Sequence, residues 1–156
     1  MPPAGCRRCA MLTAGTKANA QHPVEVHRWV EEGYSPLVFH RDWQVALLNW
    51  EPIFDSANLR EIERHRQTDE VFVLWRGRAL LFTANEAGIG LREMEPGVLY
   101  NVTQGTWHNL VATRDASFII VETRDTHLHD TEIRPMTDGE LAQLRAGLPP
   151  WAVPGA

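Results

Sequence analysis

From residue 23 to about residue 122, short apolar runs alternate with clusters of Gly, Pro, Asn and Asp. Short runs rich in Val, Ile, Phe and Trp, bounded by turn-forming residues, are typical of β-strands. We predict strands at 24–30, 37–40, 43–50, 59–65, 70–75, 79–84, 91–94, 98–102, 107–112 and 117–122, and turns that include 33–36 and 85–90. Short strands at close spacing predict an all-β domain, either a sandwich or a small barrel.

The pattern changes only near the end of the chain. Thr137, followed three residues later by Glu140, matches a capping box, and Leu141 and Leu144 follow at helical spacing. Gly147 and the prolines after it end this pattern. We therefore predict one short C-terminal helix after the strands.

The composition is that of a single folded domain. The chain has 156 residues, 44% of them hydrophobic, which is enough to bury a core of its own. A net charge of −5 without a basic cluster argues against a nucleic-acid partner. No apolar run approaches the roughly 20 residues that cross a membrane, so we predict no membrane segment.

The first part of the chain differs from the rest. Residues 1–22 are rich in Ala, Gly, Pro and Thr, and we predict an unstructured extension, with the folded domain at 23–156. Two arginines precede a mildly apolar stretch that threonines and a glycine interrupt, so a secretory signal is not predicted and a cytoplasmic location is expected. Cys6 and Cys9 have CxxC spacing, but no second pair completes a zinc site.

Two histidines and two carboxylates stand out as candidate chemistry. Alternate residues of a strand share a face, so Glu63 and His65 point to the same side. A predicted turn at 67–69 reverses the chain, and Glu70 opens the next strand. His108 comes from a more distant strand and can complete the set inside a barrel.

These side chains form a ligand set for a divalent metal ion. Two imidazoles and one carboxylate, from His65, Glu70 and His108, make a facial triad that leaves positions open for substrate or water. Such a site suits Fe(II), with Mn, Ni, Co or Zn as alternatives. Glu63 is either a fourth ligand or a catalytic general base beside the metal. In the alternative interpretation, His65 and Glu70 are a hydrogen-bonded pair in a pocket without metal.

At these positions the chain resembles the cupin superfamily. The first cupin motif has the form G-x5-H-x-H-x(3,4)-E-x6-G. Here Glu63 stands where the first histidine is expected, and His65, Glu70 and Gly77 match the second histidine, the glutamate and the closing glycine. The change at Glu63 departs from the usual three-histidine site.

The second cupin motif, G-x5-P-x-G-x2-H-x3-N, is matched less completely. Gly97, Gly105 and His108 are in register, whereas Thr103 replaces the proline and Ala112 replaces the final asparagine. The resemblance implies a single β-barrel of the cupin, or jelly-roll, type with a short C-terminal helix. Such barrels often pair through their outer strands, so the resemblance also implies a homodimer.

The resemblance covers roughly residues 40–123 and does not imply one reaction. Isomerases, dioxygenases, lyases, sugar binders and storage proteins share this superfamily. Within the superfamily, the sequence resembles a group of small single-domain bacterial cupins without an assigned reaction.

Three functions remain open. The first is a metal-dependent enzyme that acts on a small polar molecule, a sugar or an organic acid, by isomerase, lyase or oxygenase chemistry. The second is a non-catalytic module that binds a small ligand. The third is a metal-free enzyme similar to ureidoglycolate lyase, in which Glu63 and His65 are an acid–base pair.

A few other residues have predicted places. By strand alternation, Trp107 points away from His108 and is expected to pack in the core or at an interface. Asn49 is polar in an apolar strand, so we expect it to face the cavity. His127 and His129 have a metal-ligand spacing, but the residues around them predict a loop or an exposed edge.

Overall fold

The computed structural model describes residues 23–154, so the predicted extension with Cys6 and Cys9 lies outside the described residues. The described chain is built mainly from strands: β1 Gly33–His40, β2 Trp43–Asn49, β3 Glu61–His65, β4 Glu70–Arg76, β5 Ala79–Asn85, β6 Gly88–Glu93, β7 Leu99–Val102, β8 Trp107–Ala112, β9 Ser117–Thr123 and β10 Thr131–Pro135. The helices are α1 Thr126–His129 and α2 Asp138–Ala146, with short 3-10 turns η1 Pro52–Phe54 and η2 Pro150–Ala152.

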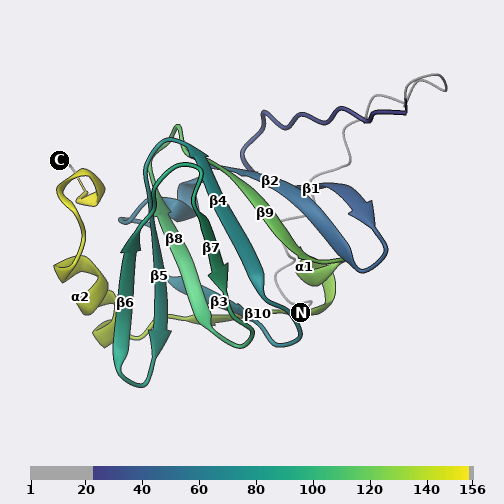
Figure 1. Ribbon diagram of the computed structural model, residues 1–156. Coiled ribbons are helices and arrows are strands. Elements are labelled where there is room, and N and C mark those ends of the chain that lie inside the picture. The colour runs from purple at the N-terminus through teal and green to yellow at the C-terminus, as the bar shows by residue number, and fades with distance from the viewer. Residues whose placement is uncertain (1–22, 155–156) are drawn as a thin grey trace, which may run out of the picture.

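The strands form two five-stranded antiparallel sheets that face each other (Figure 1). One sheet has the order β1-β2-β9-β4-β7 and is called the β4 sheet below. The other has the order β10-β3-β8-β5-β6 and is called the β8 sheet. Because the chain crosses repeatedly between the sheets, each combines early and late segments, which is a jelly-roll arrangement. The predicted all-β jelly roll with a short C-terminal helix is confirmed, with its strands in two facing sheets.

Alternation along the strands places the core between the sheets. In β2, for example, Ala46 and Leu48 are buried, whereas Val45 and Leu47 beside them are partly exposed. The core side chains include Phe72, Leu74, Phe118 and Ile120 from the β4 sheet and Leu81, Leu110 and Ala112 from the β8 sheet. Burial of these apolar surfaces is the main force that holds the two sheets together.

The C-terminal segment covers the outer face of the β8 sheet and forms a second core. Its buried side chains include Ile62, Leu80, Phe82 and Val111 from the sheet and Met136, Leu144 and Ala152 from the segment. Helix α2 begins at the predicted capping box, in which Thr137 and Glu140 each accept a hydrogen bond from the other's backbone N–H. Neither α-helix in the described part is long and apolar enough to cross a membrane.

Several local predictions were wrong. Residues 24–30 form no strand. The residues predicted as a turn at 33–36 belong to β1, because pairing with β2 continues to Gly33. Likewise β6 begins at Gly88, inside the predicted turn 85–90, because its hairpin with β5 continues to that residue. Strand β10 was not predicted, and it forms by pairing with β3.

Candidate metal site

The fold brings His65, Glu70 and His108 together between the two sheets. His65 is the last residue of β3 and Glu70 is the first of β4, so the loop between them carries the chain from one sheet to the other. His108 lies on β8, which pairs with β3. All three side chains are buried, with exposed fractions of 5% for His65, 6% for Glu70 and 1% for His108.

Hydrogen bonds to the loop between β3 and β4 fix the position of the site. The carboxylate of Asp130 accepts two backbone N–H bonds from this loop. Asp69, within the loop, accepts a bond of 2.8 Å from the N–H of Gln104. The N–H of Gly105 donates to the carbonyl of His65 at 2.6 Å. Gly105 has a φ of 79°, which favours glycine. Hydrogen bonds therefore link the segment of the first motif directly to the segment of the second.

The three functional groups converge on one point. The Oε2 atom of Glu70 lies 3.1 Å from Nε2 of His65 and 2.9 Å from Nε2 of His108. The possible ligand atoms of the three residues all lie within 4.8 Å of one another. Each residue comes from a different strand, so the arrangement depends on the tertiary fold.

The other nitrogen of each imidazole faces a backbone carbonyl. Nδ1 of His108 lies 2.9 Å from the carbonyl oxygen of Thr106, and Nδ1 of His65 lies 3.3 Å from that of Asp130. A carbonyl oxygen only accepts, so Nδ1 carries a proton and donates it. In a neutral imidazole this leaves the Nε2 lone pair directed at the centre, as in histidines that ligate metals. The donor set therefore fits a divalent metal ion.

The electrostatics of the metal-free site favour protonated imidazoles. Burial lowers the pKa of His65, but the hydrogen bond and charge of Glu70 outweigh it and raise that pKa to about 9. The pKa of His108 is raised for the same reasons, also against the effect of burial. Burial raises the pKa of Glu70, but the hydrogen bonds from His108 and His65 bring it well below its usual range. A cation at the centre would replace these protons.

A small cavity of about 20 Å³ adjoins Glu70 and His108. Its volume suits one water-sized particle. Its lining includes Tyr34, Phe54, Glu63, Phe72 and Asn109, together with Glu70 and His108. Glu63 lies outside the group of three close ligands, on the cavity wall. Its charge contributes to the raised pKa values of both histidines. Glu63 therefore shares the wall of this cavity with Glu70 and His108.

A second buried polar cluster, absent from the sequence prediction, lies next to the first. Glu122 on β9 is directly opposite Glu70 on β4. Its carboxylate accepts hydrogen bonds from the hydroxyl of Tyr34 and, at 2.9 Å, from Nε2 of Gln44. Burial, and next the charge of Glu70, raise the pKa of Glu122 to about 7. Burial and the charge of Glu122 also raise the pKa of Tyr34.

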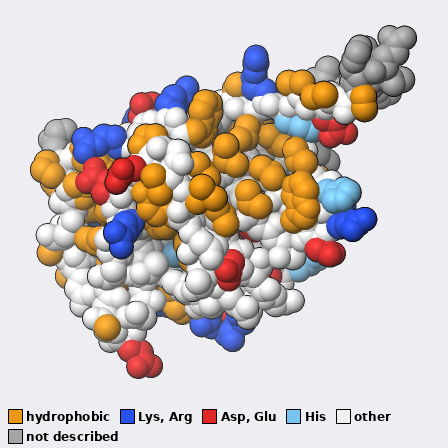
Figure 2. Space-filling view, viewed as in Figure 1, with side chains coloured by type: hydrophobic (Ala, Val, Ile, Leu, Met, Phe, Trp, Pro, Cys, Tyr) orange, Lys and Arg blue, Asp and Glu red, His pale blue; other side chains and the backbone are white. Residues whose placement is uncertain are grey.

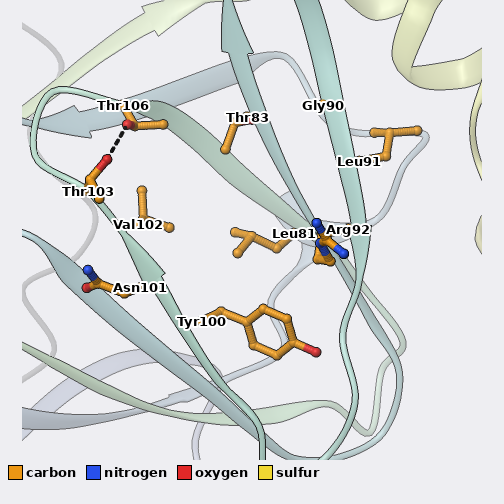
Figure 3. A pocket seen from close by; sticks show the side chains of 10 residues that line it. All are labelled: Leu81, Thr83, Gly90, Leu91, Arg92, Tyr100, Asn101, Val102, Thr103 and Thr106. Atoms are coloured by element: carbon orange, nitrogen blue, oxygen red, sulfur yellow. Dashed lines mark hydrogen bonds between the residues drawn. The ribbon is translucent and has the colours of Figure 1, made fainter.

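A larger cavity of about 360 Å³ is lined by residues of β5 and β7, the strands next to β8 and β4. Thr83 in its wall is opposite His108, and Val102 in its wall is opposite Glu70. Figure 3 shows Thr103 and Thr106, joined by a hydrogen bond, on one side and Arg92 on another. The remaining lining residues are Leu81, Gly90, Leu91, Tyr100 and Asn101. This cavity has polar walls, whereas Glu63, Glu70 and His108 line the smaller cavity.

The prediction for Trp107 is confirmed, whereas the prediction for Asn49 is not. Trp107 points away from His108, as predicted, and packs against the second core. The guanidinium groups of Arg64 and Arg134 lie 4.4 Å and 4.8 Å from its ring centre. The prediction for Asn49 was wrong, because its amide bonds instead to backbone carbonyls of the segment before β1.

His127 and His129 lie in the short helix α1, where a loop or strand edge was predicted. Residues two apart in a helix do not share a face, so these two imidazoles are not placed as a pair of metal ligands. His127 turns toward the second polar cluster, with Nδ1 at 3.3 Å from Nε2 of Gln44. His129 is exposed.

No protein-family model and no curated protein sequence matches this chain. Solved structures do align with it. A cupin-2 domain protein from Shewanella frigidimarina is 20% identical, covering 62% of this chain and 85% of that one, with a TM-score of 0.48. KdgF from Halomonas sp. is 18% identical, covering 65% and 91%, with a TM-score of 0.46. An oxalate decarboxylase variant from Bacillus subtilis is 13% identical, covering 62% and 26%, with a TM-score of 0.45. The strand order of the two sheets shows that the chain has a jelly-roll fold.

Proposed function

We propose that this protein binds one divalent metal ion through His65, Glu70 and His108 and acts on a small polar molecule. The observation that carries the proposal is the orientation of the imidazoles. Both Nε2 atoms face the same buried carboxylate oxygen, at 3.1 Å and 2.9 Å, while both Nδ1 atoms face backbone carbonyls. Groups held in this way need little rearrangement to bind a cation.

The ligand types narrow the candidate ions. Two imidazoles and one carboxylate suit Fe(II), Mn, Co, Ni or Zn, and they leave positions open for other ligands. When bound, such an ion supplies Lewis-acid polarisation of a substrate carbonyl, carboxylate or hydroxyl, the chemistry on which isomerases, lyases and oxygenases depend.

We place the substrate in the 360 Å³ cavity beside the metal position. This volume lies in the lower part of the range for small-molecule sites. The hydroxyls of Thr83, Thr103 and Thr106 in its wall suit a polar substrate, and Arg92 supplies a cation. An organic acid therefore fits this lining better than a neutral sugar does, because its carboxylate can pair with Arg92.

Glu63 is the candidate general base. It lies on the wall of the small cavity together with Glu70 and His108, where its carboxylate can take a proton from the part of the substrate that reaches the metal. The metal-free alternative pairs Glu63 with His65. The geometry favours it less, because the two nitrogens of His65 face Glu70 and the carbonyl of Asp130.

Elemental analysis of protein purified without chelators tests the proposal. We expect about one equivalent of a divalent transition metal in the native chain. His65→Ala and His108→Ala should each retain less than about a tenth of it, because each removes a ligand. The matched control is His129→Ala, which removes an exposed imidazole and should keep the metal.

A native chain that takes up no divalent metal, even after reconstitution, would refute the metal site. Turnover is then measured with a panel of hydroxy acids, keto acids and sugars. Metal bound without turnover of any of them would favour the non-catalytic binding module.

The role of Arg92 has its own test. Arg92→Ala should weaken malonate binding to the metal-loaded protein about tenfold, or about 1.4 kcal/mol, because the substrate loses one charge-assisted contact. Isothermal titration calorimetry measures this, and the neutral analogue malonamide should bind equally to both proteins. The control is Arg145→Ala, at an exposed position of α2. An equal loss for malonate and malonamide would show that the effect is not electrostatic.

A further inference from the structure

Another cavity, of about 580 Å³, lies at one end of the β8 sheet, between the turn that joins β5 to β6 and the loop that precedes β8. We call it the rim cavity, and its lining includes Asn85, Glu86, Gln104, Trp107 and Arg134, together with Thr83 and Thr106. Thr83 is opposite His108 and faces the inside of the sandwich, whereas Trp107 packs in the second core on the outside. The rim cavity therefore reaches from the inner side of the sheet to its outer side.

The rim cavity adjoins the 360 Å³ cavity in which we place the substrate. Thr83 and Thr106 line both of them. Figure 3 shows Thr106 and Arg92 on different sides of the 360 Å³ cavity. One path therefore leads from Arg92, past two threonine hydroxyls, to Trp107. A molecule too long for the first cavity can extend along this path into the second.

The backbone holds the amide groups of the rim cavity in place. Oδ1 of Asn85 accepts a hydrogen bond of 2.8 Å from the N–H of Ala87, and Nε2 of Gln104 donates one of 2.6 Å to the carbonyl of Arg66. The other end of each amide, and the indole N–H of Trp107, bond to no group within residues 23–154. A ligand therefore meets donors from Asn85 and Trp107 and an acceptor from Gln104.

The charges in the rim cavity nearly cancel. Its arginine, Arg134, donates hydrogen bonds of 2.9 Å and 2.6 Å to the carboxylate of Glu140, and its wall also contains Glu86. Arg92 differs, because it forms no ion pair in the described part of the chain. A carboxylate is therefore favoured at Arg92, whereas a phosphate or a second carboxylate gains little in the rim cavity.

The surroundings of the rim cavity are polar as well. Figure 2 shows few hydrophobic side chains around the turn between β5 and β6, in contrast to the surface over β2, β9 and β4. An apolar ligand would leave the donors and the acceptor of the rim cavity without partners, which is unfavourable. The group that fits is neutral and rich in hydroxyls.

We propose that the substrate is an organic acid that carries a neutral sugar ring. Its carboxylate lies at Arg92 and its sugar ring lies in the rim cavity. Each hydroxyl of a sugar both donates and accepts hydrogen bonds, which matches the groups of Asn85, Gln104 and Trp107. The C–H groups of the ring suit the apolar surface of the indole. This substrate class rests on the proposed function, which places the acid in the 360 Å³ cavity.

Isothermal titration calorimetry with two probes, gluconate and lactobionate, tests the proposal. Both probes carry the same gluconate group, and lactobionate adds one neutral galactose ring. We expect the metal-loaded native chain to bind lactobionate about tenfold more tightly than gluconate. Trp107→Phe keeps an aromatic ring but removes the N–H, and it should weaken lactobionate binding about fivefold and leave gluconate binding unchanged. The matched control is Trp75→Phe, the same change at an exposed position on β4, which should alter neither affinity.

Far-UV circular dichroism checks that Trp107→Phe is folded. If it is not, Asn85→Asp replaces it, because aspartate keeps the oxygen that bonds to Ala87 and removes the amide donor. Equal affinity of the native chain for the two probes would overturn the proposal, as would binding of neither. A folded Trp107→Phe or Asn85→Asp protein that loses both probes equally would also overturn it.

The same titrations after treatment with a chelator separate this proposal from the metal site. A preference for lactobionate that persists without metal, and that Trp107→Phe reduces, would support the rim cavity as a sugar site even if the native chain took up no metal. Metal uptake together with equal affinity for the two probes would leave the metal site standing and overturn the sugar site.

Discussion

Metal affinity is expected to rise steeply with pH, by up to about 100-fold per pH unit below about pH 9. An imidazole must lose the proton on Nε2 before that nitrogen can bind a cation. In the metal-free protein the pKa of His65 is about 9, because the hydrogen bond and charge of Glu70 outweigh the opposing effect of burial. The pKa of His108 is raised as well, again by Glu70. Binding one metal ion therefore releases up to two protons in this range.

Two histidines with the ordinary pKa of about 6.5 would behave differently, with an affinity that levels off above about pH 7.5. Competition with a chelating dye at several pH values gives the profile. Calorimetry in two buffers with different protonation enthalpies counts the released protons. Glu70→Gln is the informative control. Without the charge of Glu70, the affinity should be lower and the pH above which it levels off should also be lower. A native profile that is flat between about pH 7 and pH 9 would contradict the raised pKa values.

The strands that the sequence predicts correctly are those in which local preference and tertiary environment agree. Strand β8 was predicted with its observed bounds, because it is β-rich and lies between clear turns. Strand β10 is Thr-Glu-Ile-Arg-Pro, with almost no apolar alternation, and it exists because β3 offers a neighbouring row of backbone groups. The start of β1, Gly-Tyr-Ser-Pro, consists largely of turn formers, and pairing with β2 overrides their preference.

The residues of the candidate site also differ in how far the sequence predicts them. His65, Glu70 and His108 were predictable because alternation within strands and motif spacing both indicated them. The cluster of Tyr34, Gln44 and Glu122 belongs to no motif, and its members are up to 88 residues apart. A signal was nevertheless present. Gln44 lies two residues before the buried Ala46, and Glu122 lies two residues after the buried Ile120. Both polar residues therefore occupy inward positions on strand faces that are otherwise apolar. Asn49, which the sequence predicts to face the cavity, is one position out of phase with these residues and points outward.

Glu70→Gln is expected to destabilise the metal-free protein by about 3 kcal/mol near pH 6, as when one partner of a buried ion pair is removed. Glutamine keeps the volume of the side chain but loses the charge that two protonated imidazoles share. Urea denaturation with chelator present measures the free energy of unfolding. The same variant should bind metal at least about 100-fold more weakly, because a ligand oxygen and its charge are gone.

The matched control is Glu122→Gln, the same chemical change at the opposite position on the neighbouring strand. Burial and the charge of Glu70 raise the pKa of Glu122 to about 7, so its ionisation opposes folding as the pH rises from about 4.3 through that value. Removing this carboxyl should therefore leave stability nearly unchanged at about pH 4 and improve it increasingly as the pH rises to about 8. The two glutamates, although adjacent, should give effects of opposite sign at pH 8.

The pH dependence of the Glu70→Gln effect separates charge from packing. A histidine with a raised pKa stabilises the fold fully below its unfolded value of about 6.5, and this contribution is lost as the pH rises through the folded value. The lowered pKa of Glu70 adds stability that is present above about pH 4.3 and is lost as the pH falls toward its folded value. The loss on mutation should therefore be largest between about pH 4.5 and 6.5 and should shrink as the pH rises through about 9. Equal losses at about pH 5.5 and pH 9.5 would instead indicate that Glu70 acts through its shape alone.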